Sequence, residues 1–134
     1  MRPALAVVSS NTIEDVAKLG LVYLATPYSK WEQGLDDAFI QAAKITARLL
    51  RCGVRAYSPI AHTHPIAVHG KLDALDHSIW LPFDEAIMER ADVLLVAKMK
   101  GWDESRGIKH EIEFFEGKGK PVYYLDVETF EVRQ

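Results

Sequence analysis

The stretch LVYLATPY, residues 21–28, does most to set the fold of this chain. Its first residues form a continuous apolar run with no charge. Runs of this kind are typical of strands that are buried on both faces, as in parallel sheets. We therefore predict a central strand here, with ATPYS (residues 25–29) as the loop at its carboxyl end.

The residues after this strand change to a helical period. Leu35, Phe39 and Ala42 begin a set of apolar positions that continues to Leu50, with charged residues on the other face. Gly53 ends the pattern, as glycine commonly does after a helix. VRAYSP, residues 54–59, then predicts a second strand. A strand, helix, strand succession implies parallel pairing through a crossover.

The rest of the chain continues the alternation. A helix is predicted over 79–90, a strand over 92–99 (DVLLVAKM), a helix from Ser105 to Gly117 or Gly119, and a strand over 121–126. VETFEV near the end predicts an edge strand or part of a last helix. At the start, ALAVV (4–8) is a short strand or a loose arm, and Asn11–Thr12 caps a short helix through Leu19. Residues 60–78 are predicted to be an irregular connection, which at this length is typically functional or a lid.

This order of elements predicts the fold class. We expect an α/β protein with a Rossmann/flavodoxin-like, doubly wound parallel sheet of four to five strands and helices on both faces. Residues 1–134 are expected to form a single domain, with residues 1–20 as an N-terminal extension whose structure the sequence does not define.

Composition limits the classes of function. The formal net charge is −3, from 16 basic and 19 acidic residues, so no basic excess favours a nucleic-acid polymer. No apolar run reaches the length of a membrane span, and the only cysteine, Cys52, excludes an intramolecular disulfide. We expect a cytoplasmic protein whose partner is a small molecule rather than a nucleic acid or a membrane.

Doubly wound sheets bind ligands beyond the carboxyl ends of their strands. That rule brings three segments to one rim: ATPYS, PIAHTHP (59–65) and KMKGWDESRG (98–107). Four residues of the first two segments are candidates for contact with a substrate, namely Thr26, Tyr28, His62 and His64. Trp31, Trp80 and Trp102 flank the rim and suit stacking on a base or packing at an interface.

Ser105, Arg106 and Gly107 open a predicted helix. Ser105 is a good N-cap, Gly107 allows close approach to the backbone, and free N–H groups at a helix start suit an anion. Arg106 can assist in binding it. An ordinary capped helix explains the same residues equally well.

Two carboxylates are candidates for chemistry. Glu111 lies one turn after Gly107 and borders the buried face marked by Ile108. Partial burial makes a carboxylate a nucleophile or base. Asp84, on the preceding helix, would supply the second carboxylate of an acid/base pair. Spacing alone fits solvated surface charges as well, and Tyr23 fits either the core or the rim pocket.

Taken together, these residues resemble one family. YLATPYS (23–29), Asp84 and ADVLLVAKMKGWDESRGIKHEIEFFEGKGKPV (91–122) look like the nucleoside 2-deoxyribosyltransferase superfamily. The shared pattern is an aromatic-led first strand, ADxxxV, then SxGxxxE opening a helix and GKPV before the last parallel strand. SPIAHTHPI (58–66) looks like an uncharacterised bacterial and phage branch of that superfamily. The resemblance spans roughly residues 21–126.

The resemblance implies roles for three residues. Glu111 matches the nucleophile that attacks the anomeric carbon and forms a glycosyl-enzyme intermediate. Asp84 matches the aspartate that assists proton transfer to the leaving base, and Tyr23 matches the tyrosine that positions the nucleophile. Such chemistry parallels retaining glycoside hydrolysis, in which a carboxylate traps an oxocarbenium-like carbon.

The sequence also departs from the transferases. They have aspartate where this chain has Ser105, whereas the branch that hydrolyses nucleoside 5′-monophosphates has serine there, near the phosphate. The transferases use a late asparagine from a neighbouring subunit, and this chain has no asparagine after Asn11. By resemblance we also expect a homo-oligomer, either a dimer or a tetramer.

Three functional hypotheses follow. The first is cleavage of the N-glycosidic bond of a nucleoside or nucleoside 5′-monophosphate by a glutamate nucleophile, as a hydrolase or a transferase, with no cofactor and no metal. The alternative is a non-catalytic nucleotide-binding or sensor module. A third is a metal hydrolase that uses His62, His64 and an acid such as Asp76.

Overall fold

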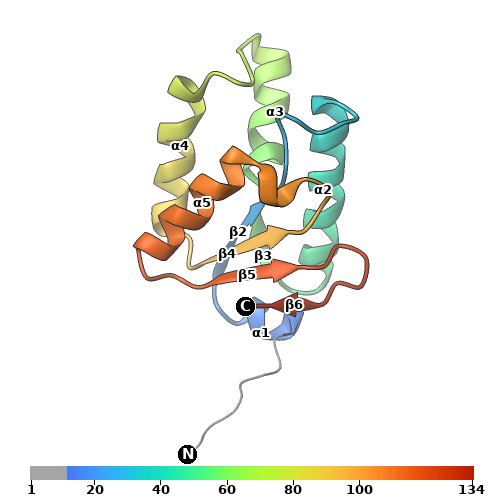
Figure 1. Ribbon diagram of the computed structural model, residues 1–134, viewed down its shortest axis with the longest axis vertical. Helices are drawn as coiled ribbons and strands as arrows, with labels where there is room; N and C mark the ends of the chain where they lie inside the picture. The colour runs from blue at the N-terminus through green and yellow to red at the C-terminus, as the bar shows by residue number, and fades with distance from the viewer. Residues whose placement is uncertain (1–11) are drawn as a thin grey trace, which may run out of the picture.

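The computed structural model describes residues 12–134, so the expectation for residues 4–8 lies outside the described residues. Those residues form a five-stranded sheet in the order β3–β2–β4–β5–β6. All neighbouring pairs are parallel except β5 with β6. Helices lie on both faces of the sheet (Figure 1). The predicted α/β, doubly wound, Rossmann/flavodoxin-like class is confirmed.

The two central strands have the apolar runs that suggested them. They are β2 (Leu21–Ala25) and β4 (Val93–Ala97), and every residue of β4 is buried. Both faces are covered because successive side chains point to opposite sides and each side packs on helices. β3 (Arg55–Tyr57) and β5 (Val122–Leu125) flank this pair.

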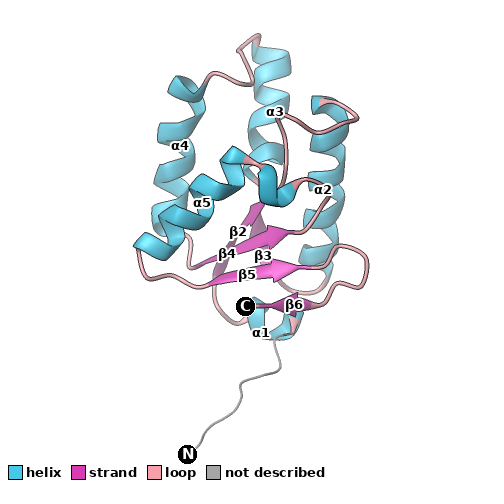
Figure 2. Cartoon of the chain, viewed as in Figure 1, coloured by secondary structure: helices cyan, strands magenta, loops and turns pink. Residues whose placement is uncertain are grey.

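The core forms one cluster of buried side chains on each face of the sheet. Figure 2 shows the helices and strands that enclose these clusters. One cluster joins alternate strand residues such as Leu24 and Leu95 to α1 (Ile13–Ala17) and α2 (Leu35–Arg51). The other joins Leu94 and Val96 to α4 (His77–Arg90) and α5 (Arg106–Gly117). The bounds of α2 and α5 agree with the sequence prediction, and Thr12 caps α1 through Asp15 as a capping box.

The prediction of an irregular connection over residues 60–78 is wrong for most of its length. Residues Pro59–Gly70 form a helix, α3, and the predicted strand over 54–59 is limited to β3. Ser58 caps the helix by accepting from the Ala61 N–H at 3.1 Å, and Pro59 occupies the favoured first helical position. Pro65 inside the helix masked it in the sequence, since proline usually breaks helices.

The remaining differences are at element ends. α4 begins two residues before the predicted start, with Asp76 as N-cap. A short 3-10 helix, η1 (Trp102–Glu104), precedes α5, and the C-terminal segment forms the edge strand β6 (Val132–Arg133). Of the two predictions for that segment, the strand is therefore correct.

The order of the strands determines where a ligand can bind. From β2 the chain crosses to β3 on one side, and it later returns to β4 on the other side. The connections that leave adjacent strands thus run to opposite sides, which opens a crevice beyond the carboxyl ends of β2 and β4.

Candidate functional site

A cavity of about 600 Å³ lies at this crevice. Its walls are the loop after β2, the start of α3, the middle of α4, and the turn from η1 into α5. The predicted site residues that line it are Thr26, Tyr28, Asp84, Ser105, Arg106, Gly107 and Glu111. Its volume lies within the range of natural small-molecule sites.

Glu111 and Asp84 face this cavity from neighbouring helices, α5 and α4. Burial raises the pKa of Glu111 to about 8, with a second contribution from the charge of Asp84. Burial also raises the pKa of Asp84 to about 6. Between these two pKa values the pair holds one proton, and the higher pKa of Glu111 places that proton mainly on Glu111 and leaves Asp84 ionised.

Tyr23 lies on β2, within the sheet, and does not line the cavity. It is fully buried, and its ring contacts Phe115 of α5 at a centroid distance of 5.9 Å. Burial and the nearby Glu111 and Asp84 carboxylates raise the pKa of Tyr23 far above its usual value. The hydroxyl therefore keeps its proton, and its interaction with Glu111 lowers the pKa of that carboxyl. No hydrogen bond of good geometry fixes the Tyr23 hydroxyl to any group in the described part of the chain.

Unpartnered polar atoms gather around this cavity. Among residues 12–134, four buried side-chain atoms lack a hydrogen-bond partner: Tyr23 Oη, Thr26 Oγ1, Tyr57 Oη and Asp84 Oδ1. Thr26 and Asp84 line the cavity, and the Tyr57 ring lies 5.8 Å from that of Tyr23. Burial, and then the charge of Asp84, raise the pKa of Tyr57 to about 12. Buried polar groups are normally paired, so this concentration marks a place for polar ligand atoms or water.

Ser105 caps α5 as predicted. Its hydroxyl accepts from the Ile108 N–H at 3.2 Å. A side chain at Gly107 would have room, because the nearest atom to a methyl group at this position would be Ser105 Oγ at 3.8 Å. Packing within the protein therefore does not require glycine here. Arg106 is exposed and lines the cavity, as does Lys100, which pairs with Glu32 at 2.9 Å.

The two predicted histidines do not line the cavity. His62 is exposed on α3 and stacks on Phe83 of α4 at a centroid distance of 5.3 Å. His64 is buried, and it bonds to Tyr28 and to Asp36 rather than facing a ligand. The two side chains also point in different directions, since residues two apart do not share a helix face.

The amino-acid sequence matches a known family over residues 20–127, under the description Domain of unknown function (DUF1937). The chain belongs to this family. The DUF1937 match contains every candidate site residue, from Tyr23 to Glu111. No curated protein gives a significant match to the chain.

Of the three tryptophans that the sequence placed beside the rim of this DUF1937 domain, Trp31 and Trp80 line the cavity. Each indole N–H is bonded, that of Trp31 to Asp37 at 2.7 Å and that of Trp80 to the Asp73 carbonyl at 2.8 Å. Trp102 instead packs on Tyr124. The hydrogen-bonded series of side chains from Tyr28 through His64 to Asp36 was not predicted from the sequence. No local pattern joins residues that are 36 and 28 positions apart.

The histidines and acids of the metal-hydrolase hypothesis do not form a metal site. Within residues 12–134, no group of three or more His, Cys, Asp or Glu side chains is placed to hold a metal ion. Asp76, the acid of that hypothesis, caps α4 instead.

In the part of the chain that the structure describes, no helix is both long enough and apolar enough to cross a membrane.

Proposed function

We propose that this protein cleaves the N-glycosidic bond of a nucleoside or nucleoside 5′-monophosphate, with Glu111 as the nucleophile. The observation that carries the proposal is the pair of desolvated carboxyls, Glu111 and Asp84, at one cavity. The resemblance to nucleoside 2-deoxyribosyltransferases names the same two residues, and membership of that superfamily is part of the proposal.

The proposed reaction has two steps. The proton that the pair shares first moves from Glu111 to Asp84. The Glu111 carboxylate then attacks the anomeric carbon, the carbon–nitrogen bond breaks, and the leaving base takes the proton from Asp84. A water molecule then attacks the glycosyl ester, and the Asp84 carboxylate takes its proton. This returns both carboxyls to their starting state, with one proton between them.

The other groups of the cavity fit this chemistry. Tyr23 keeps its proton at neutral pH, so it acts as a hydrogen-bond donor toward the Glu111 carboxylate. Trp31 and Trp80 present aromatic surface to a planar base. Arg106 and the start of α5 suit a phosphate, so the 5′-monophosphates are the preferred substrate class.

The test measures the release of free base, which is detected by chromatography. The protein is incubated with ribo- and deoxyribonucleosides and their 5′-monophosphates. Glu111→Gln should lower the rate by at least about 10³-fold, and Asp84→Asn by about 10²–10⁴-fold. Mass spectrometry of the quenched reaction should find the glycosyl group on the peptide that contains Glu111.

The matched control is Glu113→Gln, which removes an exposed carboxyl from the same helix and should leave the rate unchanged. Undiminished turnover in Glu111→Gln would reject the mechanism. Tight nucleotide binding without any base release would instead favour the non-catalytic binding module.

A further inference from the structure

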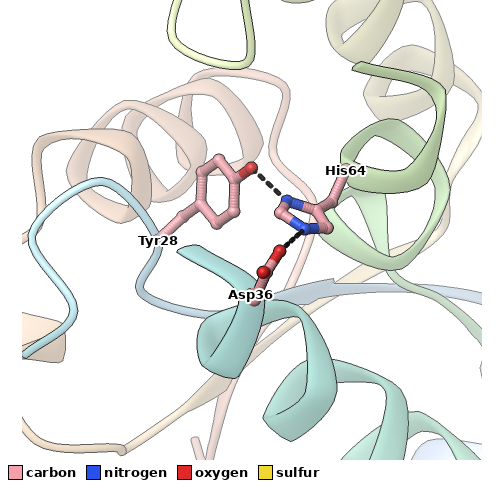
Figure 3. Close-up of polar contacts among 3 residues, drawn as sticks. All are labelled: Tyr28, Asp36 and His64. Atoms are coloured by element: carbon pink, nitrogen blue, oxygen red, sulfur yellow. Dashed lines mark hydrogen bonds and ion pairs between the residues drawn. The ribbon is translucent and has the colours of Figure 1, made fainter. Parts of the chain in front are cut away.

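A continuous chain of hydrogen bonds leads from the cavity wall to the surface. Tyr28 Oη lies 2.6 Å from His64 Nδ1, and His64 Nε2 lies 2.7 Å from Asp36 Oδ1 (Figure 3). The three residues come from the loop after β2, from α3 and from α2. Of the three, only Tyr28 lines the cavity.

The His64 ring is held firmly between its neighbours. The residue is only 4% exposed, and the ring stacks on Phe39 of α2 with centroids 4.8 Å apart and planes 22° apart. Tyr28 meets the same ring edge-on at a centroid distance of 5.7 Å. With both nitrogens bonded and one face stacked on Phe39, the ring has a single orientation.

The positions of the protons in this series of hydrogen bonds follow from the group at its surface end, Asp36. The Asp36 side chain is 88% exposed to water, and its carboxylate oxygen, which only accepts hydrogen bonds, lies 2.7 Å from His64 Nε2. His64 Nε2 therefore carries a hydrogen. When the ring is neutral, the other nitrogen, Nδ1, is an acceptor, and Tyr28 donates its hydroxyl proton to it.

This arrangement leaves Tyr28 with one kind of hydrogen bond for a ligand. Burial, and then the charge of Asp36, raise the pKa of Tyr28, so the phenol keeps the proton that it donates to His64. The remaining lone pairs of Tyr28 Oη can only accept. A ligand at this wall must therefore offer a donor, or leave a partly buried polar atom unpaired at a cost.

We propose that Asp36 and His64 fix Tyr28 as the hydrogen-bond acceptor for a sugar hydroxyl of the ligand. Tyr28 is the specificity residue, and His64 and Asp36 are positioning residues. The choice of a sugar hydroxyl rests on the proposed function. Glu111 must meet the anomeric carbon, and Tyr28 lines the same cavity as Glu111, so a sugar hydroxyl is the ligand group assigned to Tyr28.

The proton positions are tested directly by ¹⁵N nuclear magnetic resonance of the histidine rings at neutral pH, with His64→Gln used to assign the signals. The expected result is a neutral His64 ring with its hydrogen on Nε2. A hydrogen on Nδ1, or a charged ring, would overturn the proposal. This measurement does not depend on any activity.

Recognition of the hydroxyl is tested by binding in a Glu111→Gln background, where the ligand is not consumed. The probes are adenosine 5′-monophosphate and its 2′-deoxy and 3′-deoxy forms, and the signal is tryptophan fluorescence. Tyr28→Phe should weaken binding about tenfold for probes that carry the recognised hydroxyl and should not change it for the one that lacks it. His64→Phe should give the same selective pattern.

Tyr123→Phe, on β5 and absent from the cavity wall, is the control for loss of a phenol hydroxyl. An equal loss for all three probes, or no loss for any, would reject the acceptor role, and so would the absence of all nucleotide binding. The selective pattern without base release by the wild-type protein would uphold the acceptor role while rejecting the proposed hydrolysis.

Discussion

At the scale of single residues, Glu111 and Asp84 show how position changes the meaning of a carboxylate. In the sequence, Glu111 borders an apolar helix face and Asp84 stands beside Glu85, so surface charges fit both. In the structure, both carboxyls lie at one cavity, and their pKa values rise to about 8 and about 6. Perturbed pairs of this kind gather at functional sites.

The first prediction concerns the pH dependence of base release. Below about pH 6 both carboxyls are protonated and no nucleophile is present, and above about pH 8 both are ionised and no acid remains for the leaving base. We expect a bell-shaped profile of kcat/KM between these limits. Asp84→Asn should leave a single limb, set by the ionisation of Glu111, whose pKa falls because the neighbouring charge is lost. A flat profile from pH 5 to pH 9 would contradict the shared proton.

At the scale of elements, the position of α4 determines where Asp84 lies. One side chain fixes the C-terminal end of this helix. Lys120, just before β5, places its Nζ 3.2 Å from the carbonyl of Met88, 2.6 Å from that of Glu89 and 2.7 Å from that of Ala91. A cation on the last free carbonyls of a helix satisfies them and complements the helix dipole. This contact joins the end of α4 to the strand beside β4.

The second prediction follows for Lys120→Met. Loss of three charge-assisted hydrogen bonds should lower the free energy of unfolding by about 1–3 kcal/mol, as measured by urea denaturation. Lys109→Met removes an exposed lysine from α5 and is the control. Equal stability of the two variants would show that Lys120 contributes no more than a surface charge.

At the scale of the whole molecule, the cavity reduces the stability of the fold. Unpartnered polar atoms and two desolvated carboxyls lie together at the switch point of the sheet, where a packed apolar core would be more stable. The free energy of unfolding is a property of the whole chain. The loss of stability caused by the buried carboxyls should therefore appear in the way this free energy changes with pH.

The third prediction is that Glu111→Gln is more stable than the wild type in alkaline solution. The folded pKa of Glu111 is about 8, above its usual 4.5, so the folded state binds the proton more tightly than the unfolded state. The stability that this carboxyl contributes is fully present below pH 4.5 and is lost as the pH rises through 8. The glutamine does not titrate.

The gain of the Glu111→Gln variant over the wild type should therefore grow across that interval, to at most about 5 kcal/mol, because one pKa unit corresponds to about 1.4 kcal/mol. Urea denaturation at pH 5, 7 and 9 measures it, with Glu113→Gln as the control for loss of an exposed carboxyl. A difference that does not change with pH would show that Glu111 is solvated.

The sequence by itself determined the sheet, because unbroken apolar runs at residues 21–25 and 93–97 can only be buried on both faces. It also determined the bounds of α2 and α5, through apolar periodicity and the Ser105 cap, and the rim where the cavity lies. Tertiary structure alone decided that residues 59–70 form a helix, since Pro65 contradicts the local propensity and packing of α3 on α2 overcomes it. It alone decided that His64 supports Tyr28 instead of lining the cavity, because hydrogen bonds between distant segments follow from the packing of helices and leave no local pattern.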